Sequence, residues 1–559
     1  MDSLGSINTR RTPQSDRADA RQEPNAAGGF TFTVDDRARL QRFLTLGTEG
    51  GTYYAQAREL ARDNADVVFR AAATDPIALV RQIVEVSTAG RAPRQNPALF
   101  ALAIAASADD VDGRRAALDA LPQVARTGTH LFLFARYVEQ FRGWGPTLRK
   151  AVARWYTEMP VDKLAYQLVK YRQREGWSHH DVLRLASPSG VTAPDRRMAL
   201  NWAVRKGLAD YPDRDAGAGQ PPLPTADTVP ESLAIIADFE DAQAATAAQG
   251  WLDVIARGHG LSWEMLPDAA LNEPQVWHAL IEQGLPQTAL MRQLPRLTRL
   301  GVLTGDTLRA VAEQLQDSQR LIRARVHPIN VLVAQRTYAS GKSARGEGIW
   351  SPIPAISDAL DSAFYNAYGA VEPANKRTLL ALDISGSMGS SVSGLLLSCR
   401  EACAALAMVT AATEPDHQIV GFTDGKAGDY RGDWRANTVL SQLDISPRRR
   451  LDDTCRYTAG LPMGGTDCAL PMVWALQNRV EIDTFEILTD NETWFGSIHP
   501  HQALREYREK MGINARLVVV SMTGTRNSIT DPNDPLTLDV SGFDATVPQL
   551  IADFSRGDL

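Results

Sequence analysis

Three short oxygen-bearing side chains follow a strongly apolar segment of this chain. The segment TLLAL (378–382) predicts a buried strand, and Asp383, Ser385 and Ser387 then stand at alternate positions. Hard divalent cations prefer oxygen ligands of this kind. No His or Cys is interleaved with them, which argues against zinc or copper. Because Asp and Ser are also common turn residues, the pattern alone fits an ordinary turn as well.

Two later residues strengthen the interpretation as a metal site. Thr466 follows Gly464-Gly465 at the start of a predicted helix, and Asp490 ends a predicted strand. Strands near 378, 418, 484 and 516 alternate with helices over 393–412, 466–479 and 499–510. This order predicts a parallel sheet with helices on both faces, whose carboxyl ends meet at one edge. We therefore expect a single divalent cation at that edge, bound by Asp383, Ser385, Ser387, Thr466 and Asp490.

The region 371–559 resembles the von Willebrand factor A domain. In that family, residues matching these five positions surround a magnesium-type ion at the metal-ion-dependent adhesion site. The resemblance implies that the cofactor is Mg²⁺. It also implies that Ser385, Ser387 and Thr466 bind it directly, whereas Asp383 and Asp490 act partly through water.

Size and composition predict a large globular protein with more than one domain. The chain has 559 residues, of which 44% are hydrophobic and 22% are charged. No apolar run approaches about 18 residues, so no membrane span is expected, and the N-terminus lacks a signal-peptide core. Residues 1–29 are polar and are predicted to be a disordered tail. The four cysteines are expected to be reduced in a cytoplasmic protein, with Cys399 and Cys403 in the core.

Residues 30–370 differ in character from the C-terminal region, because helical periodicity dominates and strand signals are scarce. Examples are DDRARLQRFL, NPALFALAIAASA and ESLAIIADFEDAQAATA. Turn clusters separate these segments, and 211–230 is too rich in Pro and Gly to be a helix. We interpret 30–370 as stacked helix pairs of the HEAT or armadillo kind. The fold class is therefore mainly α, followed by an α/β domain.

Charge is distributed unevenly along the chain. The net charge is −7, which argues against a protein that coats nucleic acid, yet residues 136–206 hold 14 Lys and Arg against 6 Asp and Glu. The same window contains eight Tyr and Trp residues. Aromatic faces can stack on unpaired bases, but most of these side chains are expected in the core.

The most specific basic feature is the segment DKLAYQLVKYRQR (162–174). As a helix it places Lys163, Gln167, Lys170 and Arg174 on one stripe beside an apolar stripe that faces the array. We expect this basic stripe to be exposed. The adjacent His179 and His180 cannot face the same way, so one of them should be exposed.

Five segments together resemble the TROVE domain of the Ro autoantigen and its relatives. They are RFLTLGTEGGTYY (42–54), FRGWGPTLRKAVARWY (141–156), YQLVKYRQREGWSHHDVLRL (166–185), LSWEMLP (261–267) and RVHPINVLVAQRTY (325–338). A TROVE domain followed by a von Willebrand A domain is the arrangement of Ro itself, so the chain resembles a bacterial-type Ro protein.

The resemblance implies a ring of helical repeats that binds RNA. Family members take single-stranded 3′ ends of misfolded RNA into a central hole and bind a small Y RNA on the outer basic surface. Bacterial members can be tethered by such an RNA to a 3′-to-5′ exoribonuclease, polynucleotide phosphorylase. The segment matching Lys170–His180 carries the family's Y RNA contacts. We assign as RNA-binding Arg142, Lys163, Lys170, Arg174, His179, His180 and Arg184.

One position departs from the family pattern. Ser187 stands where the family commonly has a His, although Arg184 is retained. This substitution bears on the detailed Y RNA footprint and leaves the predicted fold unchanged.

No catalytic signature accompanies these motifs. The chain has neither a Gly-x-Ser-x-Gly elbow nor a phosphate-binding Gly-x-x-x-x-Gly-Lys loop. We therefore predict a monomeric RNA-binding protein and not an enzyme. Two alternatives stay open. One is a metal-dependent protein-adhesion module, and the other is a metal-dependent nuclease, which would need several carboxylates close together.

Overall fold

The structure is a computed structural model of the whole chain. It describes residues 11–25, 27–33, 36–46, 65–88, 95–205, 229–343, 348–392, 396–422, 440–461, 466–489, 493–522, 527–541 and 547–558. These residues form two compact units, a C-terminal unit (1–64, 314–347 and 354–559) and a helical unit (65–313 and 348–353).

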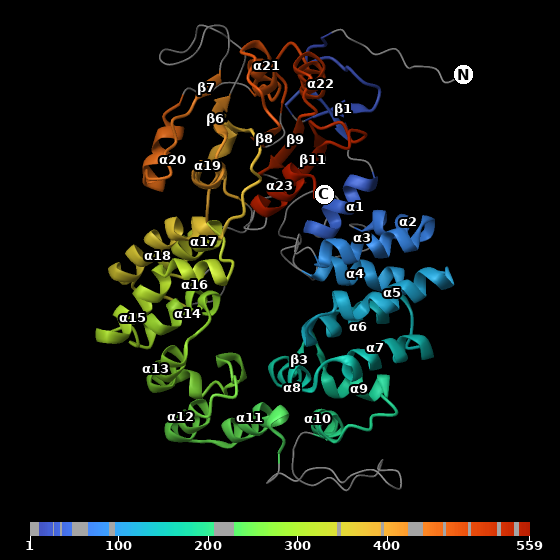
Figure 1. The fold of residues 1–559 in the computed structure, drawn as a ribbon, viewed down its shortest axis with the longest axis vertical. Helices are drawn as coiled ribbons and strands as arrows, with labels where there is room; N and C mark the ends of the chain where they lie inside the picture. Colours follow the sequence, from blue (N-terminus) through green and yellow to red (C-terminus); the bar gives the residue numbers. More distant parts are fainter. Residues whose placement is uncertain are drawn as a thin grey trace. The chain divides into compact units, whose positions relative to one another are not determined.

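The helical unit is a two-layer stack of short helices (Figure 1). Helices two positions apart pack on each other, so α3 packs on α5, α4 on α6, α5 on α7 and α7 on α9. The side chains of α4 from Pro97 to Ala105 are all buried, because the helix is apolar on every side. This packing confirms the predicted array of helix pairs. Only Val229 and Pro230 of the predicted 211–230 loop are among the described residues.

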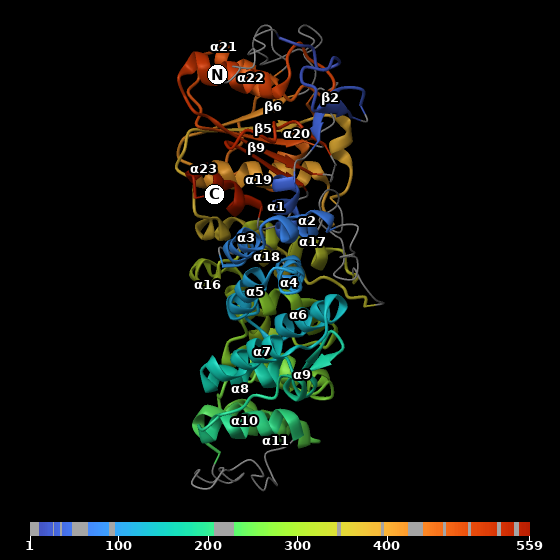
Figure 2. The ribbon, with the colours of Figure 1, turned by 90° about the vertical axis from the view of Figure 1, so that its right-hand side faces the viewer.

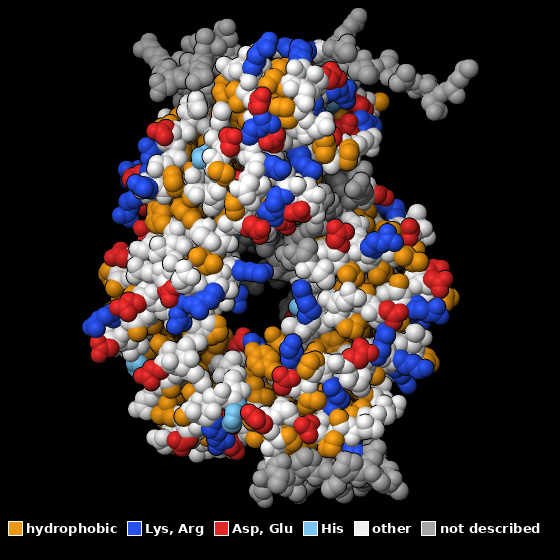
Figure 3. Space-filling view, in the orientation of Figure 1, with side chains coloured by type: hydrophobic (Ala, Val, Ile, Leu, Met, Phe, Trp, Pro, Cys, Tyr) orange, Lys and Arg blue, Asp and Glu red, His pale blue; other side chains and the backbone are white. Residues whose placement is uncertain are grey.

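The helices of this unit are short, and their bounds are as follows: α2 (Asp66–Thr74), α3 (Pro76–Thr88), α4 (Asn96–Ala105), α5 (Val111–Val124), α6 (Gly128–Phe141), α7 (Pro146–Glu158), α8 (Val161–Lys170), α9 (His179–Ala186), α10 (Pro194–Arg205), α11 (Ala234–Ala244), α12 (Ala248–Ala256), α13 (Pro274–Gln283), α14 (Gln287–Arg299) and α15 (Gly305–Gln316). Figure 3 shows Lys and Arg interspersed with Asp and Glu over the described residues of the face in view. That face therefore carries no single-sign coat of charge on the part of the array that is described.

The C-terminal unit contains a six-stranded sheet in the order β11-β9-β8-β5-β6-β7. Its strands are β5 (Thr378–Asp383), β6 (His417–Phe422), β7 (Leu440–Gln442), β8 (Thr484–Thr489), β9 (Arg516–Ser521) and β11 (Thr537–Ser541). All pairs are parallel except β6 with β7. The predicted parallel sheet is thus confirmed, with an antiparallel edge strand added.

Helices cover both faces of this sheet (Figure 2). One face packs on α21 (Leu470–Gln477) and α22 (Pro500–Met511) through a core that includes Phe485, Trp474 and Tyr507. The other face is covered by α19 (Cys399–Thr413) and α23 (Val547–Arg556). Helix α19 starts at Cys399 and not at 393, because Ser398 and Glu401 form a capping box there.

The N-terminal segment folds onto the C-terminal unit, so the predicted disordered tail over 1–29 is wrong for its described residues. Strands β1 (Gln22–Pro24) and β2 (Phe30–Thr33) pair antiparallel, and β2 also pairs with β10 (Asn527–Ser528). The Gln14 side chain is fully buried, and its Nε2 donates to Asp467 Oδ1 at 2.7 Å and to the Ile498 carbonyl at 2.9 Å. A polar sequence with long-range partners gives no local signal, which is why the segment resembled a disordered tail.

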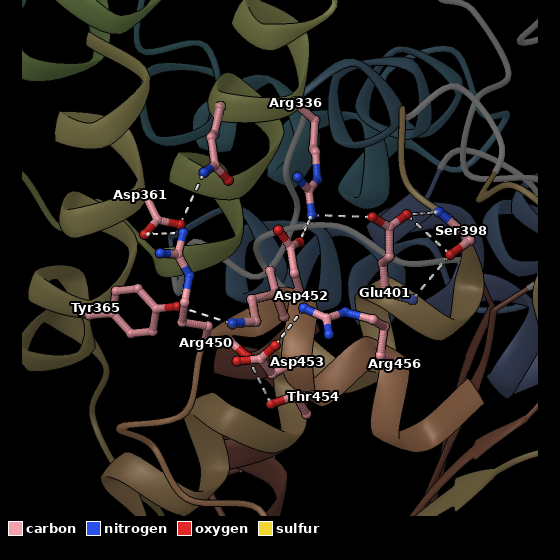
Figure 4. A network of polar contacts seen from close by, with 12 residues as sticks. Arg336, Asp361, Tyr365, Ser398, Glu401, Arg450, Asp452, Asp453, Thr454 and Arg456 are labelled. Atoms are coloured by element: carbon pink, nitrogen blue, oxygen red, sulfur yellow. Dashed lines mark hydrogen bonds and ion pairs between the residues drawn. The ribbon is translucent and has the colours of Figure 1, made fainter. Parts of the chain in front are cut away.

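A polar network joins helices α17 (Pro328–Ala339) and α18 (Pro354–Asn366) to the sheet domain (Figure 4). Arg336 lies 2.8 Å from Asp452 and 3.3 Å from Glu401. Burial lowers the pKa of Arg336, but the two carboxylates raise it by more, so the net shift is upward. The Leu451 N–H donates to the Tyr365 hydroxyl at 3.0 Å. These contacts explain why α17 and α18 belong to the C-terminal unit, although the predicted boundary between the domains was 370/371.

Two smaller expectations concern cysteines and membrane spans. All four cysteines are free, and Cys399, Cys403 and Cys468 are buried. Among the described residues, no helix is both long and apolar enough to cross a membrane.

Candidate functional sites

The first candidate site lies where strand β5 ends. Asp383 is 3% exposed, and its Oδ1 accepts a hydrogen bond from the Ser385 N–H at 2.8 Å. Its Oδ2 accepts from the Thr489 hydroxyl, at the end of β8, also at 2.8 Å. The hydroxyls of Ser385 and Ser387 lie 3.0 Å apart. The structure therefore brings a carboxylate and two hydroxyls together as the sequence predicted.

The segment that carries Thr466 reaches the same sheet edge. Cys468 Sγ lies 3.8 Å from the Thr489 hydroxyl that contacts Asp383, and Thr466 itself is buried. Asp490 lies outside the described residues. No group of three or more His, Cys, Asp or Glu side chains among the described residues is arranged to hold a metal. The donor set is instead hydroxyl-rich and all oxygen, which fits Mg²⁺ bound partly through water.

The second candidate site is the basic segment, which differs in shape from the prediction. Helix α8 ends at Lys170, and β3 (Gln173–Arg174) pairs antiparallel with β4 (Trp177–Ser178). The connecting residues Glu175 and Gly176 have φ values of 56° and 82°, which suits the twist of a two-residue hairpin loop. The predicted helix over 162–174 is therefore wrong after Lys170. Arg174 does not continue the helical stripe but stands exposed on the hairpin.

Lys170 is engaged by neighbouring side chains. Its Nζ donates to the Tyr166 hydroxyl at 3.0 Å and lies 3.2 Å from Glu264 Oε2. Burial lowers the pKa of Lys170, but these two contacts outweigh it and the net shift is upward. The prediction of a freely exposed Lys170 is wrong, because a residue 94 positions away in the chain supplies a carboxylate that no local pattern reveals.

The paired imidazoles face different environments, as expected, but His179 is the buried one. It is 2% exposed, its Nε2 donates to the Gln167 carbonyl at 3.3 Å, and its Nδ1 accepts from the Tyr156 hydroxyl at 2.9 Å. Burial lowers the pKa of His179 to about 3, so the ring is neutral. The assignment of His179 as an RNA contact is therefore wrong. His180 keeps 33% of its side chain exposed.

The other assigned cations divide into engaged and available groups. Arg142 donates to the carbonyl of Ala106, the C-cap residue that ends α4, at 3.0 Å. Lys163, Arg174 and Arg184 are exposed and form no ion pair with any described residue. Ser187, the departure from the family pattern, ends α9 with a left-handed φ of 43°.

Half of the eight Tyr and Trp residues in this window lie in the core, fewer than expected, and the other four are partly exposed. Tyr137, Trp155, Tyr156 and Trp202 are buried. Trp177, on the hairpin, is only half-buried and packs against Trp144 with ring centroids 6.0 Å apart. The hairpin therefore brings together an aromatic face and a cation that has no ion-pair partner among the described residues.

The TROVE domain model matches residues 23–337, and the Ro60 vWA domain model matches residues 377–555. The chain belongs to the Ro60 family. Membership of this family and the mainly α fold followed by an α/β domain were both predicted, and both are confirmed.

Two curated relatives cover nearly the whole chain. The first is the protein named RNA-binding protein RO60 of Deinococcus radiodurans, 40% identical over 562 residues, which span 100% of this chain and 99% of that one. The second has the same name in Caenorhabditis elegans and is 33% identical over 98% of this chain and 92% of the relative. The crystal structure of the Deinococcus radiodurans RO (RSR) protein matches with a TM-score of 0.76 and 38% identity, covering 94% of this chain and 100% of that chain.

The Ro60 family models and the compact units divide the chain differently. The TROVE match ends at 337, yet residues 314–347 pack with the C-terminal unit. The end of the TROVE match reflects sequence similarity among the helical repeats. The limits of the compact units reflect spatial contacts such as those of Arg336, so the two boundaries differ.

Proposed function

We propose that this chain binds RNA and acts as the protein component of a ribonucleoprotein. The observation that carries the proposal is the exposed Arg174 on the β3–β4 hairpin beside the half-buried Trp177; the Arg174 guanidinium donates to the Gln173 carbonyl and forms no ion pair with a described residue. A guanidinium without a carboxylate partner suits a phosphate, and an accessible aromatic face suits an unpaired base. The names of the two curated relatives support RNA as the ligand.

The finer proposal concerns which RNA is bound and with what result. We infer that a small Y-like RNA binds the hairpin surface, defined as Arg174, Trp177, His180 and Arg184. Single-stranded 3′ ends of misfolded RNA bind the helical array elsewhere, and a 3′-to-5′ exoribonuclease such as polynucleotide phosphorylase then degrades them. In this proposal the protein is a cytoplasmic monomer that presents RNA and performs no chemistry itself.

The hairpin surface is tested by replacing Arg174 and Arg184 together with Ala. Loss of two phosphate contacts should weaken binding of a Y-like RNA and reduce the log–log salt slope by about two. The matched control replaces Arg292 and Arg299, two exposed arginines on α14 that form no ion pair with described residues. Equal affinity and slope for both double variants would contradict the assignment.

Preference for free 3′ ends is tested by competition between two RNA hairpins that differ only in a single-stranded 3′ tail. Stacking and backbone contacts need bases that are not already paired, so the tailed RNA should compete better. Equal competition would argue against 3′-end binding and would leave the hairpin surface unaffected.

We also propose that the β5 edge binds one Mg²⁺ through Asp383, Ser385, Ser387, Thr466 and Asp490. Only two of the five side chains are charged, so affinity should be modest until water or a partner's acid completes the shell. In crystals soaked with manganese, Asp383→Ala should remove the anomalous signal. RNA affinity should remain, because the RNA contacts belong to the helical unit. Loss of RNA binding in a folded Asp383→Ala protein would contradict this division.

A second candidate function is metal-dependent docking of a protein partner. Trp494 is 42% exposed, and its backbone N–H donates to the Thr466 carbonyl at 3.3 Å, which places this exposed residue next to a proposed ligand. This function would be favoured if the protein, purified free of RNA, captured an acidic protein only in magnesium and if Trp494→Ala abolished the capture. Capture that is unchanged by Trp494→Ala would count against it.

A further inference from the structure

A cavity of about 650 Å³ lies between α8 and α11 in the helical unit. Tyr166 and Lys163 line it from α8, Ser232 from the 3-10 turn before α11, Ile235 from α11 itself, and His259 from the loop after α12. Its volume is in the range of small-ligand pockets. We call it the α8–α11 pocket. It does not include any residue of the hairpin surface.

His259 is held in one orientation at this pocket. Asp238, which is 2% exposed, accepts from His259 Nδ1 at 2.8 Å, and its other oxygen lies 3.0 Å from the guanidinium of Arg257. Because a carboxylate only accepts, Nδ1 carries the proton and Nε2 is the acceptor of the neutral ring. No described residue contacts Nε2.

The backbone on both sides of His259 is specialised for this placement. Gly258 and Gly260 have φ values of +76° and +86°, a region that side chains other than glycine rarely adopt. A Cβ at either position would meet nothing within 4 Å. The glycines are therefore required by the path of the chain and not by close packing, and that path presents the imidazole to the pocket.

Tyr166 supplies an aromatic surface. Its hydroxyl is bonded to Lys170 at 3.0 Å, which restrains the ring while the side chain stays half-buried in the pocket wall. Lys163, one turn earlier, is exposed and has no ion-pair partner among the described residues. An aromatic face next to a free ammonium is a combination that accepts a base and its phosphate.

The charge of the pocket favours a nucleotide within a strand over a free polyphosphate. Arg126 and Lys163 line it together with Asp162 and Glu231, so the cations and acids balance. A polyphosphate would meet two carboxylates and is disfavoured, whereas one nucleotide within a strand brings a single charge. The acids and Nε2 can accept hydrogen bonds from base amino groups or a 2′-hydroxyl.

We infer that the α8–α11 pocket binds one unpaired nucleotide of a single-stranded RNA tail. Its base lies against Tyr166 and hydrogen-bonds to His259, and its phosphate lies beside Lys163. This inference rests on the proposed RNA-binding function and gives it a specific site for the tail, separate from the hairpin surface.

The test measures binding of a hairpin with and without a 3′ tail by fluorescence anisotropy. Tyr166→Leu should weaken binding of the tailed RNA about ten-fold, because the stacking of one base is lost. His259→Ala should weaken binding of the tailed RNA about five-fold, because one hydrogen bond is lost. Neither change should affect the blunt hairpin. Tyr166→Phe keeps the ring and loses only the bond to Lys170, so it should bind within about two-fold of the parent. His278→Ala is the matched control outside the pocket.

Cross-linking of the unmodified protein supplies a readout that does not depend on how the variants fold. A 4-thiouridine in the tail should cross-link to peptides that contain Tyr166 or residues 258–260. Cross-links confined to other peptides, or a full tail preference in both Tyr166→Leu and His259→Ala, would overturn the pocket assignment while RNA binding stood. If the unmodified chain binds neither RNA, both the pocket and the proposed function are overturned.

Discussion

Two neighbouring histidines show how strongly environment determines the role of a single residue. His179→Ala should lower the free energy of unfolding by about 3 kcal/mol, because it opens a cavity and leaves the buried Tyr156 hydroxyl without its acceptor. His180→Ala should change it by less than about 0.5 kcal/mol. Urea unfolding of the two variants checks this pair. Equal destabilisation would contradict the burial of His179.

Glu486, in the middle of β8, predicts an unusual dependence of stability on pH. Burial, with a smaller effect from Glu414, raises the pKa of Glu486 to about 8. Because this value exceeds that of the unfolded chain, about 4.5, the folded protein binds more protons between these limits. The stability from this group is therefore complete below about pH 4.5 and is lost as the pH rises to about 8.

The corresponding variant is Glu486→Gln, which removes the ionisation. Relative to the parent, it should gain up to about 1.4 kcal/mol for each pH unit between pH 5 and 8. Calorimetric melting of the C-terminal unit at pH 5, 6.5 and 8 measures this difference. A difference that does not change with pH would refute it. Buried histidines such as His179 act with the opposite sign, because their lowered pKa values remove stability as the pH falls below about 6.5.

At the same scale, the sequence predicted local groupings and missed distant ones. Asp383, Ser385 and Ser387 are neighbours in one turn, so their spacing alone indicated that their oxygens converge. The pairing of Lys170 with Glu264 and the hydrogen bond of Asp238 with His259 join residues from different elements of the helical unit. The only local signal of the latter was Gly258-His259-Gly260, two glycines around a histidine.

Among the elements, the β3–β4 hairpin offers the sharpest test. Gly176→Ala places a side chain at φ 82° in open space, so its cost is conformational and about 1 kcal/mol. The hairpin should loosen, and Y-like RNA affinity should fall as Arg174 moves. Gly143→Ala, also in open space but without a positive φ, is the control. Hydrogen exchange at Gln173 and Trp177 reports the loosening. Slow exchange in Gly176→Ala would contradict the proposed loosening.

Some elements were predictable because a single physical signal dominated them. The short apolar run at 378–382, which ends at the turn residues Asp383 and Ser385, predicted a buried strand, and the helices after it carried clear periodicity. The 171–174 stretch has a helical composition, so the turn at Glu175-Gly176 was missed. Strands β1 and β10 are short and polar and are defined only by their pairing, which a local window cannot detect.

At the scale of the whole molecule, the buried Gln14 side chain makes the N-terminal segment part of the C-terminal unit. Gln14→Ala should lower the free energy of unfolding of that unit by about 2 kcal/mol, because the buried Asp467 loses a hydrogen bond. Arg11→Ala, which breaks an ion pair whose Arg side chain is 52% exposed, should cost less than about 1 kcal/mol. Calorimetry compares the two variants. A larger cost for Arg11→Ala would contradict the role of Gln14.

The pairing of the first residues with the last domain also means that the N-terminal segment cannot complete its folding until synthesis is nearly finished. Gln14 and Asp467 are separated by 453 positions, and ribosomes add about 5–20 residues per second. The N-terminal strands therefore wait roughly 20–90 s before their partners leave the ribosome. During this interval β2 lacks its partner β10, and that edge of the β1–β2 pair is open to chaperones or to other chains. The charged and polar residues of 11–25, which hid this segment from sequence analysis, limit aggregation during the delay.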